Sequence, residues 1–324
     1  MMNVFCKTLL ASALASATLA SAYAAEPLTV YGKLNVSAQS NDENGDATTT
    51  IQSNASRFGV KGDFELSSSL TAFYTVEYQV DTGNASSDNF TARNQFVGLK
   101  GDFGSFSVGR NDTLLKISQG GVDQFNDFMN SGDLAKLFKG EVRAAQTATY
   151  LTPSFGDFVF GVTYVAEGND VKSQFAQDGF SAAAMYGDAK LKKTAVYAAL
   201  AYDSDVSGYE IVRASLQTKL AGITLGGMYQ QQEQTYKYNA TTGQPVEVSA
   251  DSATGYLLSA AYDINAVTLK AQYQDMEDLG DSWSVGADYS LGKPTKVFAF
   301  YTNRSMEASN DDDKYIVVGL EHKF

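Results

Sequence analysis

Apolar and polar residues alternate along most of this chain, in segments of about ten residues. The segment LTVYGKLNV has an apolar residue or a glycine at every second position from Leu28, with more polar side chains between them. The stretches SRFGVKGDFEL, LTAFYTVEYQV, VTLKAQYQ and SWSVGADYSL repeat this pattern. Because successive side chains of a strand point to opposite faces, a period of two predicts β-strands with one apolar face. About sixteen such segments begin near residues 28, 55, 70, 92, 105, 145, 157, 180, 194, 209, 223, 254, 267, 282, 295 and 314.

The connections between these segments alternate in length. Short turns such as LSSS at 66, DFGS at 102 and LGKPT at 291 alternate with long polar connections at 40–54, 81–90, 166–179, 233–252 and 304–314. This alternation predicts antiparallel neighbours in sequence order, which is an up-and-down meander.

The length of the predicted strands decides between a soluble and a membrane-embedded fold. A strand of about ten residues, tilted by about 40°, spans about 25 Å, the height of the apolar band of an outer-membrane barrel. A soluble sandwich or propeller is the alternative, but its strands are usually nearer five or six residues. Since a sheet can cross a bilayer only when it has no open edge, we predict an all-β transmembrane barrel of about 16 antiparallel strands.

Composition agrees with a barrel and excludes several other classes. The chain has 324 residues, with 19 Tyr, 19 Phe and 28 Gly but only 4 Pro. Its mean hydropathy is -0.20, and no run of about 18 apolar residues occurs, so helical membrane spans are excluded. The net charge of -13 argues against nucleic acid as a partner.

The N-terminus predicts a signal peptide at residues 1–24. Lys7 precedes an apolar stretch from Leu9 to Ala20, and Ala22-Tyr23-Ala24 supplies small residues around a cleavage site. A first buried helix is the alternative interpretation. Cleavage leaves residues 25–324 as a single barrel domain without cysteine, and the loss of Lys7 changes the net charge to -14, from 23 basic and 37 acidic residues.

One segment, residues 112–144, breaks the strand pattern. It contains Asp123 and Asp127 together with large apolar residues, namely Phe125, Phe128, Met129, Leu134, Leu137 and Phe138. A barrel of about sixteen strands encloses a water-filled lumen, and so many apolar side chains are unfavourable in a loop surrounded by water. We therefore predict that this third long loop folds into the lumen, narrows it and directs the two carboxylates at the channel.

Basic residues on the polar faces of the strands are candidates to balance these acids. Arg57 is on such a face, and Arg143 follows the loop. Arg93 is a third candidate, but strict alternation counted back from Val97 places it on the outward face. An inward Arg93 therefore requires a β-bulge before Val97. By the same alternation, further lumen-facing residues are predicted: Lys33, Lys61, Asp63 and Glu77.

The order of these motifs resembles the trimeric general diffusion porins of Gram-negative outer membranes. The resemblance rests on FVGLKGDFGSFSVGR, on GGVDQFNDF followed by a single Arg before TATY, and on the terminal Phe324. It implies a homotrimer in outer-membrane lipid and lipopolysaccharide, with Asp123 and Asp127 facing the wall arginines Arg57, Arg93 and Arg143. Phe324 matches the C-terminal signal read by the barrel assembly machinery, although His322 stands where an aromatic residue is usual. The segment from Asn130 to Glu141 follows no pattern of the family.

The predicted function is passive diffusion of small hydrophilic solutes and ions, with a mild cation preference because the mature chain is acidic. A solute-specific channel and a surface adhesin or binding protein are the alternatives. An enzyme is not expected, since the only His is His322 and no thiol remains. No cofactor is expected either, although the acidic stretches at Asp311–Asp313 and Asn41–Glu43 are candidates for Ca²⁺ or Mg²⁺.

Overall fold

The structure of the chain is a computed structural model. It describes residues 28–43, 45–83, 89–129, 131–167, 177–239, 241, 244–248, 250–309 and 311–324. The predicted signal peptide, residues 1–24, lies outside these described residues.

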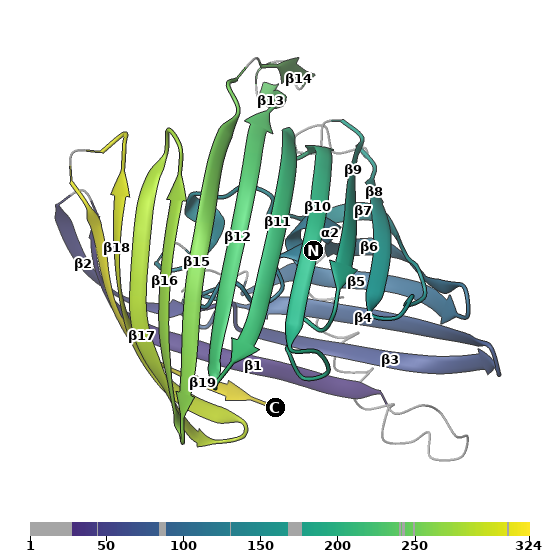
Figure 1. Cartoon of the computed structure of the whole chain (residues 1–324), viewed down its shortest axis with the longest axis horizontal. Coiled ribbons are helices and arrows are strands. Elements are labelled where there is room, and N and C mark those ends of the chain that lie inside the picture. Colours follow the sequence, from purple (N-terminus) through teal and green to yellow (C-terminus); the bar gives the residue numbers. More distant parts are fainter. Residues whose placement is uncertain are drawn as a thin grey trace, which may run out of the picture.

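The chain forms one antiparallel sheet that closes into a barrel (Figure 1). β1 pairs with both β2 and β3, which follow one another along it, and the last strand, β19, pairs with β1 and closes the barrel. Counting β2 and β3 as one strand gives the 16-stranded antiparallel barrel that the periodicity predicts. The wall strands are β1 (Thr29–Glu43), β2 (Asp46–Ser53), β3 (Arg57–Ser67), β4 (Leu70–Val80), β5 (Phe90–Gly101), β6 (Gly104–Asp112), β7 (Arg143–Leu151), β8 (Phe158–Val165), β9 (Gly179–Tyr186), β10 (Val196–Val206), β11 (Tyr209–Leu220), β12 (Ile223–Gln234), β15 (Ala253–Ile264), β16 (Val267–Met276), β17 (Gly280–Gly292), β18 (Thr295–Met306) and β19 (Asp313–Lys323).

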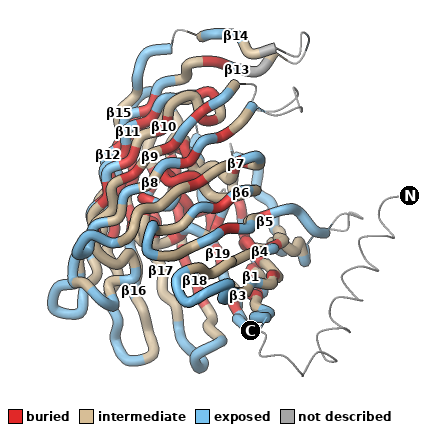
Figure 2. Tube along the Cα trace, turned by 90° about the vertical axis from the view of Figure 1, so that its right-hand side faces the viewer, coloured by how far each residue is buried: buried red, intermediate tan, exposed pale blue. Residues whose placement is uncertain are grey.

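The barrel is polar inside and apolar outside. On β11, Arg213, Ser215 and Gln217 are buried, whereas Val212 and Leu216, at alternate positions, are 40% and 55% exposed. The same alternation of buried and exposed residues recurs along the neighbouring strands (Figure 2). A wall with this pattern has its polar face on the lumen and its apolar face on the surroundings, as a membrane barrel requires.

Two of the connections predicted to be long polar loops contain strands. In the first, β1 continues to Glu43 and pairs with β2, so that the turn between them is short. In the second, β13 (Tyr236–Asn239) and β14 (Gln244–Glu247) form a hairpin that stands above the rim of the barrel (Figure 1). The sequence prediction was wrong at both places because β2 has few apolar residues, and because β13 and β14, with four residues each, are too short to show a period of two.

The segment between β6 and β7, residues 113–142, runs inside the barrel; we call it the constriction loop. It begins with the short helix α2 (Leu114–Ser118), which Thr113 caps by accepting a hydrogen bond from the backbone N–H of Lys116. A 3₁₀ turn, η1 (Leu134–Lys136), follows after several tight turns. None of the helices in the part of the chain that the structure describes is long and apolar enough to cross a membrane.

Apolar clusters fix the constriction loop to the inner wall. Leu114 and Leu115 pack against Ala183, Ala201 and Ile211. Further along, Phe125 and Phe128 pack against the wall, where their rings lie 5.2 and 4.6 Å from that of Phe300 on β18. The cluster of Val122, Leu134, Leu137 and Phe138 with Met228, Leu257 and Met276 lies between them. Since burying one Leu or Phe side chain contributes about 1.5–3 kcal/mol, these contacts hold the loop inside the lumen.

Candidate channel constriction

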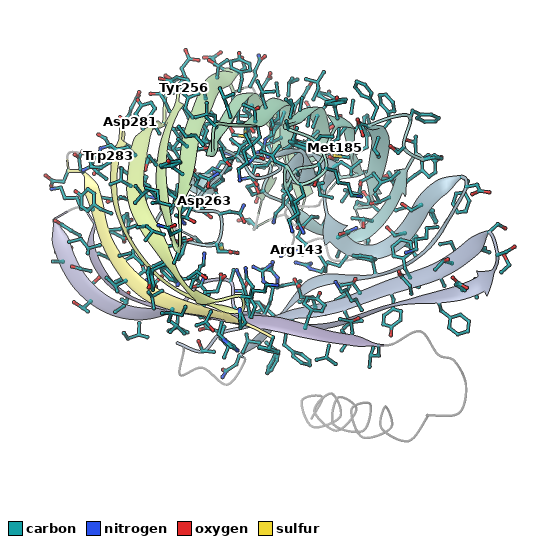
Figure 3. All side chains as sticks on the ribbon, turned by 60° about the horizontal axis from the view of Figure 1, so that its bottom comes forward. Arg143, Met185, Tyr256, Asp263, Asp281 and Trp283 are labelled. Atoms are coloured by element: carbon teal, nitrogen blue, oxygen red, sulfur yellow. The ribbon has the colours of Figure 1, made fainter. Side chains whose placement is uncertain are left out.

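The constriction loop leaves a passage on one side of the lumen, between itself and the wall formed by β3 to β7. This cavity has a volume of about 720 Å³. Its charged lining residues are six basic and five acidic: Arg57, Arg93, Arg110, Lys116, Lys139 and Arg143, and Asp112, Asp123, Asp127, Asp133 and Glu141. Figure 3 looks into the barrel and shows Arg143 directed into the lumen. The passage is therefore lined by fixed charges of both signs.

Asp127 joins the tip of the constriction loop to the wall. It forms ion pairs with Lys33 on β1 and, over 2.7 Å, with Nη2 of Arg57 on β3. Although burial opposes ionisation, these two cations hold the pKa of Asp127 below its ordinary value. Lys33, predicted only as a further lumen residue, is thus a direct partner of the loop carboxylate.

Asp123 has a different environment from Asp127. It is 6% exposed and accepts hydrogen bonds from the backbone N–H groups of Phe125, at 2.8 Å, and Leu134, at 3.0 Å. Burial raises the pKa of Asp123 to about 6, against the opposing effect of these hydrogen bonds. Among the ion pairs of the described residues, none involves Asp123. Its carboxylate borders the passage but is engaged in joining two parts of the loop.

Arg93 faces the lumen because β5 carries a bulge. Val76 pairs with Gln95 and Tyr78 pairs with Ala92, so that Arg93 and Asn94 together stand opposite the single residue Glu77. Nε of Arg93 lies 2.6 Å from Oε1 of Glu77, and Oε2 of Glu77 accepts a hydrogen bond from the hydroxyl of Tyr31. The bulge is at the position that an inward Arg93 requires.

Arg143 lies at the root of the constriction loop. Its Nη2 is 3.0 Å from Oδ1 of Asp112, its Nε donates to Asn94 over 2.5 Å, and Lys116 reaches the same Asp112 at 3.2 Å. The predicted wall arginines therefore line one cavity, but each is held by a different carboxylate.

Arg110 is a lining residue that the sequence prediction missed. Strict alternation along SFSVGR groups Arg110 with the outward Phe106 and Val108. The pairing of β6 with β7 shifts between Gly109 and Asn111, and Gly109 has φ +138°, a conformation that favours glycine. Nε of Arg110 is buried without a hydrogen-bond partner among the described residues. Gly109, directly before Arg110, was the available signal for this irregularity.

Arg213 and Lys270 fix the back of the constriction loop to the wall. Arg213 is fully buried and donates to Glu141 over 2.7 Å and to the backbone oxygens of Leu115 and Lys139. Lys270 donates to the backbone oxygen of Gln124. The sequence places both on polar strand faces, but their partners are distant in the chain and could not be identified from it.

Other predicted residues lie away from the passage. Asp63 pairs with Lys100 over 2.7 Å, and Nζ of Lys61 lies 5.2 Å from the centre of the Tyr31 ring. Phe324 is 57% exposed, and its backbone pairs with Gly32 of β1. Among the residues that the structure describes, no group of three or more His, Cys, Asp or Glu side chains is arranged to hold a metal ion.

The comparison with known families agrees with this geometry. Residues 10–312 match the family described as Gram-negative porin. The chain belongs to that family. It is accordingly an outer-membrane porin, a channel protein without enzymatic activity.

Individual porins resemble this chain over most of its length. Outer membrane porin PhoE of Salmonella typhimurium is 26% identical, over 92% of this chain and 91% of its own. Major outer membrane protein P.IB of Neisseria meningitidis is 24% identical, over 98% of this chain and 99% of its own.

Solved porin structures share the fold. OmpF of Salmonella typhi, in complex with daunomycin, has a TM-score of 0.75 at 20% identity and covers 93% of this chain and 98% of its own. The anion-selective porin of Comamonas acidovorans has a TM-score of 0.67 at 17% identity, and the match covers 92% of this chain and 100% of that porin.

Proposed function

We propose that this porin is a general diffusion channel through which small hydrophilic solutes and ions pass without an energy source. The observation that carries the proposal is the passage of about 720 Å³ between the constriction loop and the wall, with charges of both signs on its lining. Fixed charges of this kind orient dipolar solutes, while a solute with a large apolar part loses favourable hydration as it enters.

A solute-specific channel is less well supported. A sugar-selective passage is expected to present a continuous series of aromatic rings to the solute, whereas the aromatic residues that line this cavity are Phe138 and Tyr209. A relative from Halomonas, 25% identical over 86% of this chain, carries the name monosaccharide porin. Liposome-swelling rates distinguish the two functions: a general channel admits uncharged solutes in order of size, and a specific channel shows saturation with one sugar.

Ion selectivity in our proposal has two opposing sources. The net charge of the mature chain, -14 as counted from the sequence, favours cations at the mouths of the channel. The lining of the constriction has one more basic than acidic residue, which opposes this preference. We therefore propose a mild cation preference in dilute salt, which the zero-current potential of the purified porin in a planar bilayer under a salt gradient tests directly.

The porin also functions as a homotrimer in this proposal. OmpT, an outer membrane protein of Vibrio cholerae whose structure carries the description trimer form, matches 93% of this chain, with a TM-score of 0.65 at 15% identity. Light scattering in mild detergent measures the oligomeric state, and a mass corresponding to one chain would contradict the trimer.

A further inference from the structure

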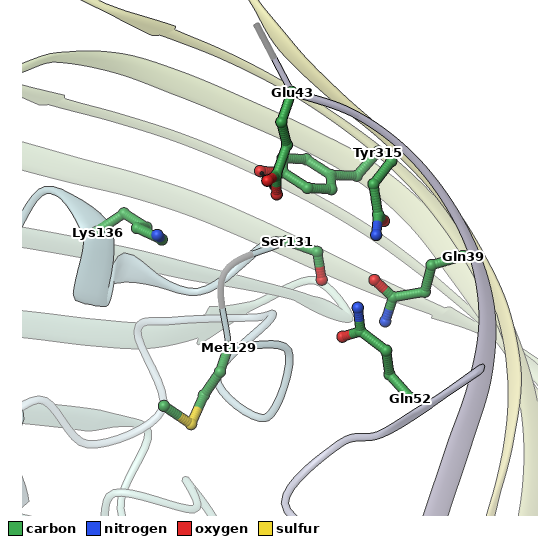
Figure 4. A pocket seen from close by; sticks show the side chains of 8 residues that line it. Gln39, Glu43, Gln52, Met129, Ser131, Lys136 and Tyr315 are labelled. Atoms are coloured by element: carbon green, nitrogen blue, oxygen red, sulfur yellow. Dashed lines mark hydrogen bonds between the residues drawn. The ribbon is translucent and has the colours of Figure 1, made fainter. Parts of the chain in front are cut away.

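A second cavity lies between the constriction loop and the wall at β1, β2 and β19. Its volume is about 290 Å³. The wall contributes Gln39, Asn41, Glu43, Gln52 and Tyr315, and the loop contributes Met129, Ser131 and Lys136 (Figure 4). Met129 also lines the passage through the constriction, so the two cavities adjoin. We call this second cavity the side pocket.

Two buried amides of the wall, Gln39 and Asn41, are among the lining residues of the side pocket and have unpaired oxygens in the described structure. Gln39 is 1% exposed and donates from Nε2 to Ser37 and Asn54, and Asn41 is 7% exposed and donates from Nδ2 to Thr50. Oε1 of Gln39 and Oδ1 of Asn41 accept no hydrogen bond within the described part of the chain. Because an unsatisfied buried acceptor is costly, this part of the pocket favours a ligand that donates hydrogen bonds.

Opposite charges stand on the two sides of the side pocket. Glu43, on the wall, accepts a hydrogen bond from the Tyr315 hydroxyl over 2.8 Å, and Lys136 extends from the loop on the other side (Figure 4). Neither forms an ion pair with another described residue. Ser131, a residue only 2% exposed, also lines the side pocket, and its hydroxyl has no partner in the described structure.

We propose that the side pocket binds a small zwitterion of the α-amino acid class. The ammonium group of such a solute carries three N–H donors, which suit Glu43 and the oxygens of Gln39 and Asn41. Its carboxylate suits the Lys136 ammonium and the Ser131 hydroxyl, because charge-assisted hydrogen bonds are the stronger ones. An uncharged polyol could use the amide oxygens but would leave Glu43 and Lys136 without a charged partner.

The position of the side pocket gives this binding an effect on the channel. A solute held there lies against Met129 and the loop, at the edge of the passage. The site therefore retains amino acids next to the passage, and each binding event changes the ion current. This inference goes beyond the proposed diffusion function, because binding can be measured without any flux.

The test combines binding and current measurements with L-alanine, using glycerol and D-glucose as uncharged probes. The variants are Lys136→Gln and Glu43→Gln, both at exposed positions, with Lys237→Gln and Glu233→Gln as matched exposed controls on other strands. Equilibrium dialysis of labelled L-alanine against the detergent-solubilised porin measures binding. Single-channel current noise measures the same occupancy in a bilayer.

The expected result is saturable binding of L-alanine, saturable current noise, and a loss of affinity of about tenfold in either pocket variant but in neither control. Binding that fails to saturate, or pocket variants that behave like the controls, would overturn the proposal. Saturation by glycerol or glucose that is insensitive to Lys136→Gln would also overturn it, since the pocket would then be a polyol site. A porin that binds L-alanine but does not conduct would contradict the diffusion function and leave the side-pocket assignment standing.

Discussion

Arg57 on β3 and Asp127 at the tip of the constriction loop form an ion pair of 2.7 Å between the wall and the loop. The same carboxylate also binds Lys33 on β1. One acidic residue thus joins the loop to two wall strands and fixes the edge of the passage. The width and the charge of the constriction therefore both depend on Asp127.

Replacing Asp127 with Asn leaves Arg57 without a counter-charge and leaves Lys33 with Glu321 as its remaining ion-pair partner. We expect the anion-to-cation permeability ratio to rise by roughly fivefold, because a unit charge at 4 Å contributes about 1 kcal/mol in water. The zero-current potential under a salt gradient measures this change. The matched control is Asp311→Asn, at an exposed position outside the constriction. An unchanged ratio in Asp127→Asn would contradict the role of Asp127 in the passage.

Replacing Arg213 with Met removes the buried cation that holds Glu141 and two backbone oxygens of the constriction loop. We expect a loss of about 3–5 kcal/mol in the stability of the docked loop, the usual cost of leaving one partner of a buried pair uncompensated. Limited proteolysis of the loop and thermal unfolding in detergent measure this loss.

The matched control for this change is Lys219→Met on the same strand. Lys219 is exposed and pairs with Asp263 only at 3.7 Å, so the expected loss is at most about 1 kcal/mol. The double variant Arg213→Met, Glu141→Met should recover part of the stability, since no buried charge then remains unpaired. Equal protease resistance of Arg213→Met and the wild type would show that Arg213 does not hold the loop.

The pH dependence of selectivity should follow Asp123. Its pKa is raised to about 6 by burial, so lowering the pH from 7 to 5 protonates it and removes one negative charge from the lining. We expect the cation preference to decrease across this interval. Because the raised pKa makes the folded state bind this proton more tightly than the unfolded state, the contribution of Asp123 to stability decreases as the pH rises from about 4 to 6.

The variants Asp123→Asn and Asp127→Asn separate the two acids. Asp123→Asn should abolish the change in selectivity near pH 6, and Asp127→Asn should retain it, because the pKa of Asp127 is below its ordinary value. Zero-current potentials measured at several pH values show which of the two variants loses the titration. A titration near pH 6 that persists in Asp123→Asn would assign it to another group.

Replacing Arg110 with Gln should increase the cation preference without loss of stability. Arg110 lines the passage and forms no ion pair with the residues described, so its removal leaves no carboxylate uncompensated. The control is Lys100→Gln, whose lysine pairs with Asp63 away from the constriction. Ion selectivity and thermal unfolding should be measured on both variants, and marked destabilisation by Arg110→Gln would indicate a structural role for the guanidinium.

Salt concentration should change how much the channel mouths and the constriction each contribute to ion selectivity. Screening extends over about 30 Å at 0.01 M salt and about 3 Å at 1 M, so the acidic mouths lose influence as salt rises while the narrow constriction loses less. We expect the cation preference to decline from 0.01 M to 1 M salt. A permeability ratio that is independent of salt would place the source of selectivity within the constriction alone.

The sequence predicted the barrel because one face of nearly every strand must be apolar. This requirement ends outside the apolar band, and the prediction failed there: β2, whose central residues are Thr48, Thr49 and Thr50, was interpreted as loop. Threonine favours strands, but without an apolar face the period of two gave no signal.

The site was predicted less completely than the barrel, for a geometric reason. Strict alternation fails at irregular pairings: a bulge in β5 turns Arg93 inward, and Arg110 lines the passage where the pairing of β6 with β7 shifts after Gly109. The pair of Arg213 and Glu141 spans 72 positions, and nothing in the local pattern of either residue identifies the other. The buried state of Asp123 likewise depends on how the loop folds back to Leu134.

The pairing of β1 with β19 joins the first and last strands of the wall, and the backbone of Phe324 bonds to Gly32 in both directions. On its other edge β1 pairs with β2 and β3, and β19 also pairs with β18. A barrel without β19 would leave one edge of β1 and one edge of β18 open, which is unfavourable in lipid. The wall can therefore seal only after its last strand has been made, so no earlier part of the sheet is stable in the membrane by itself.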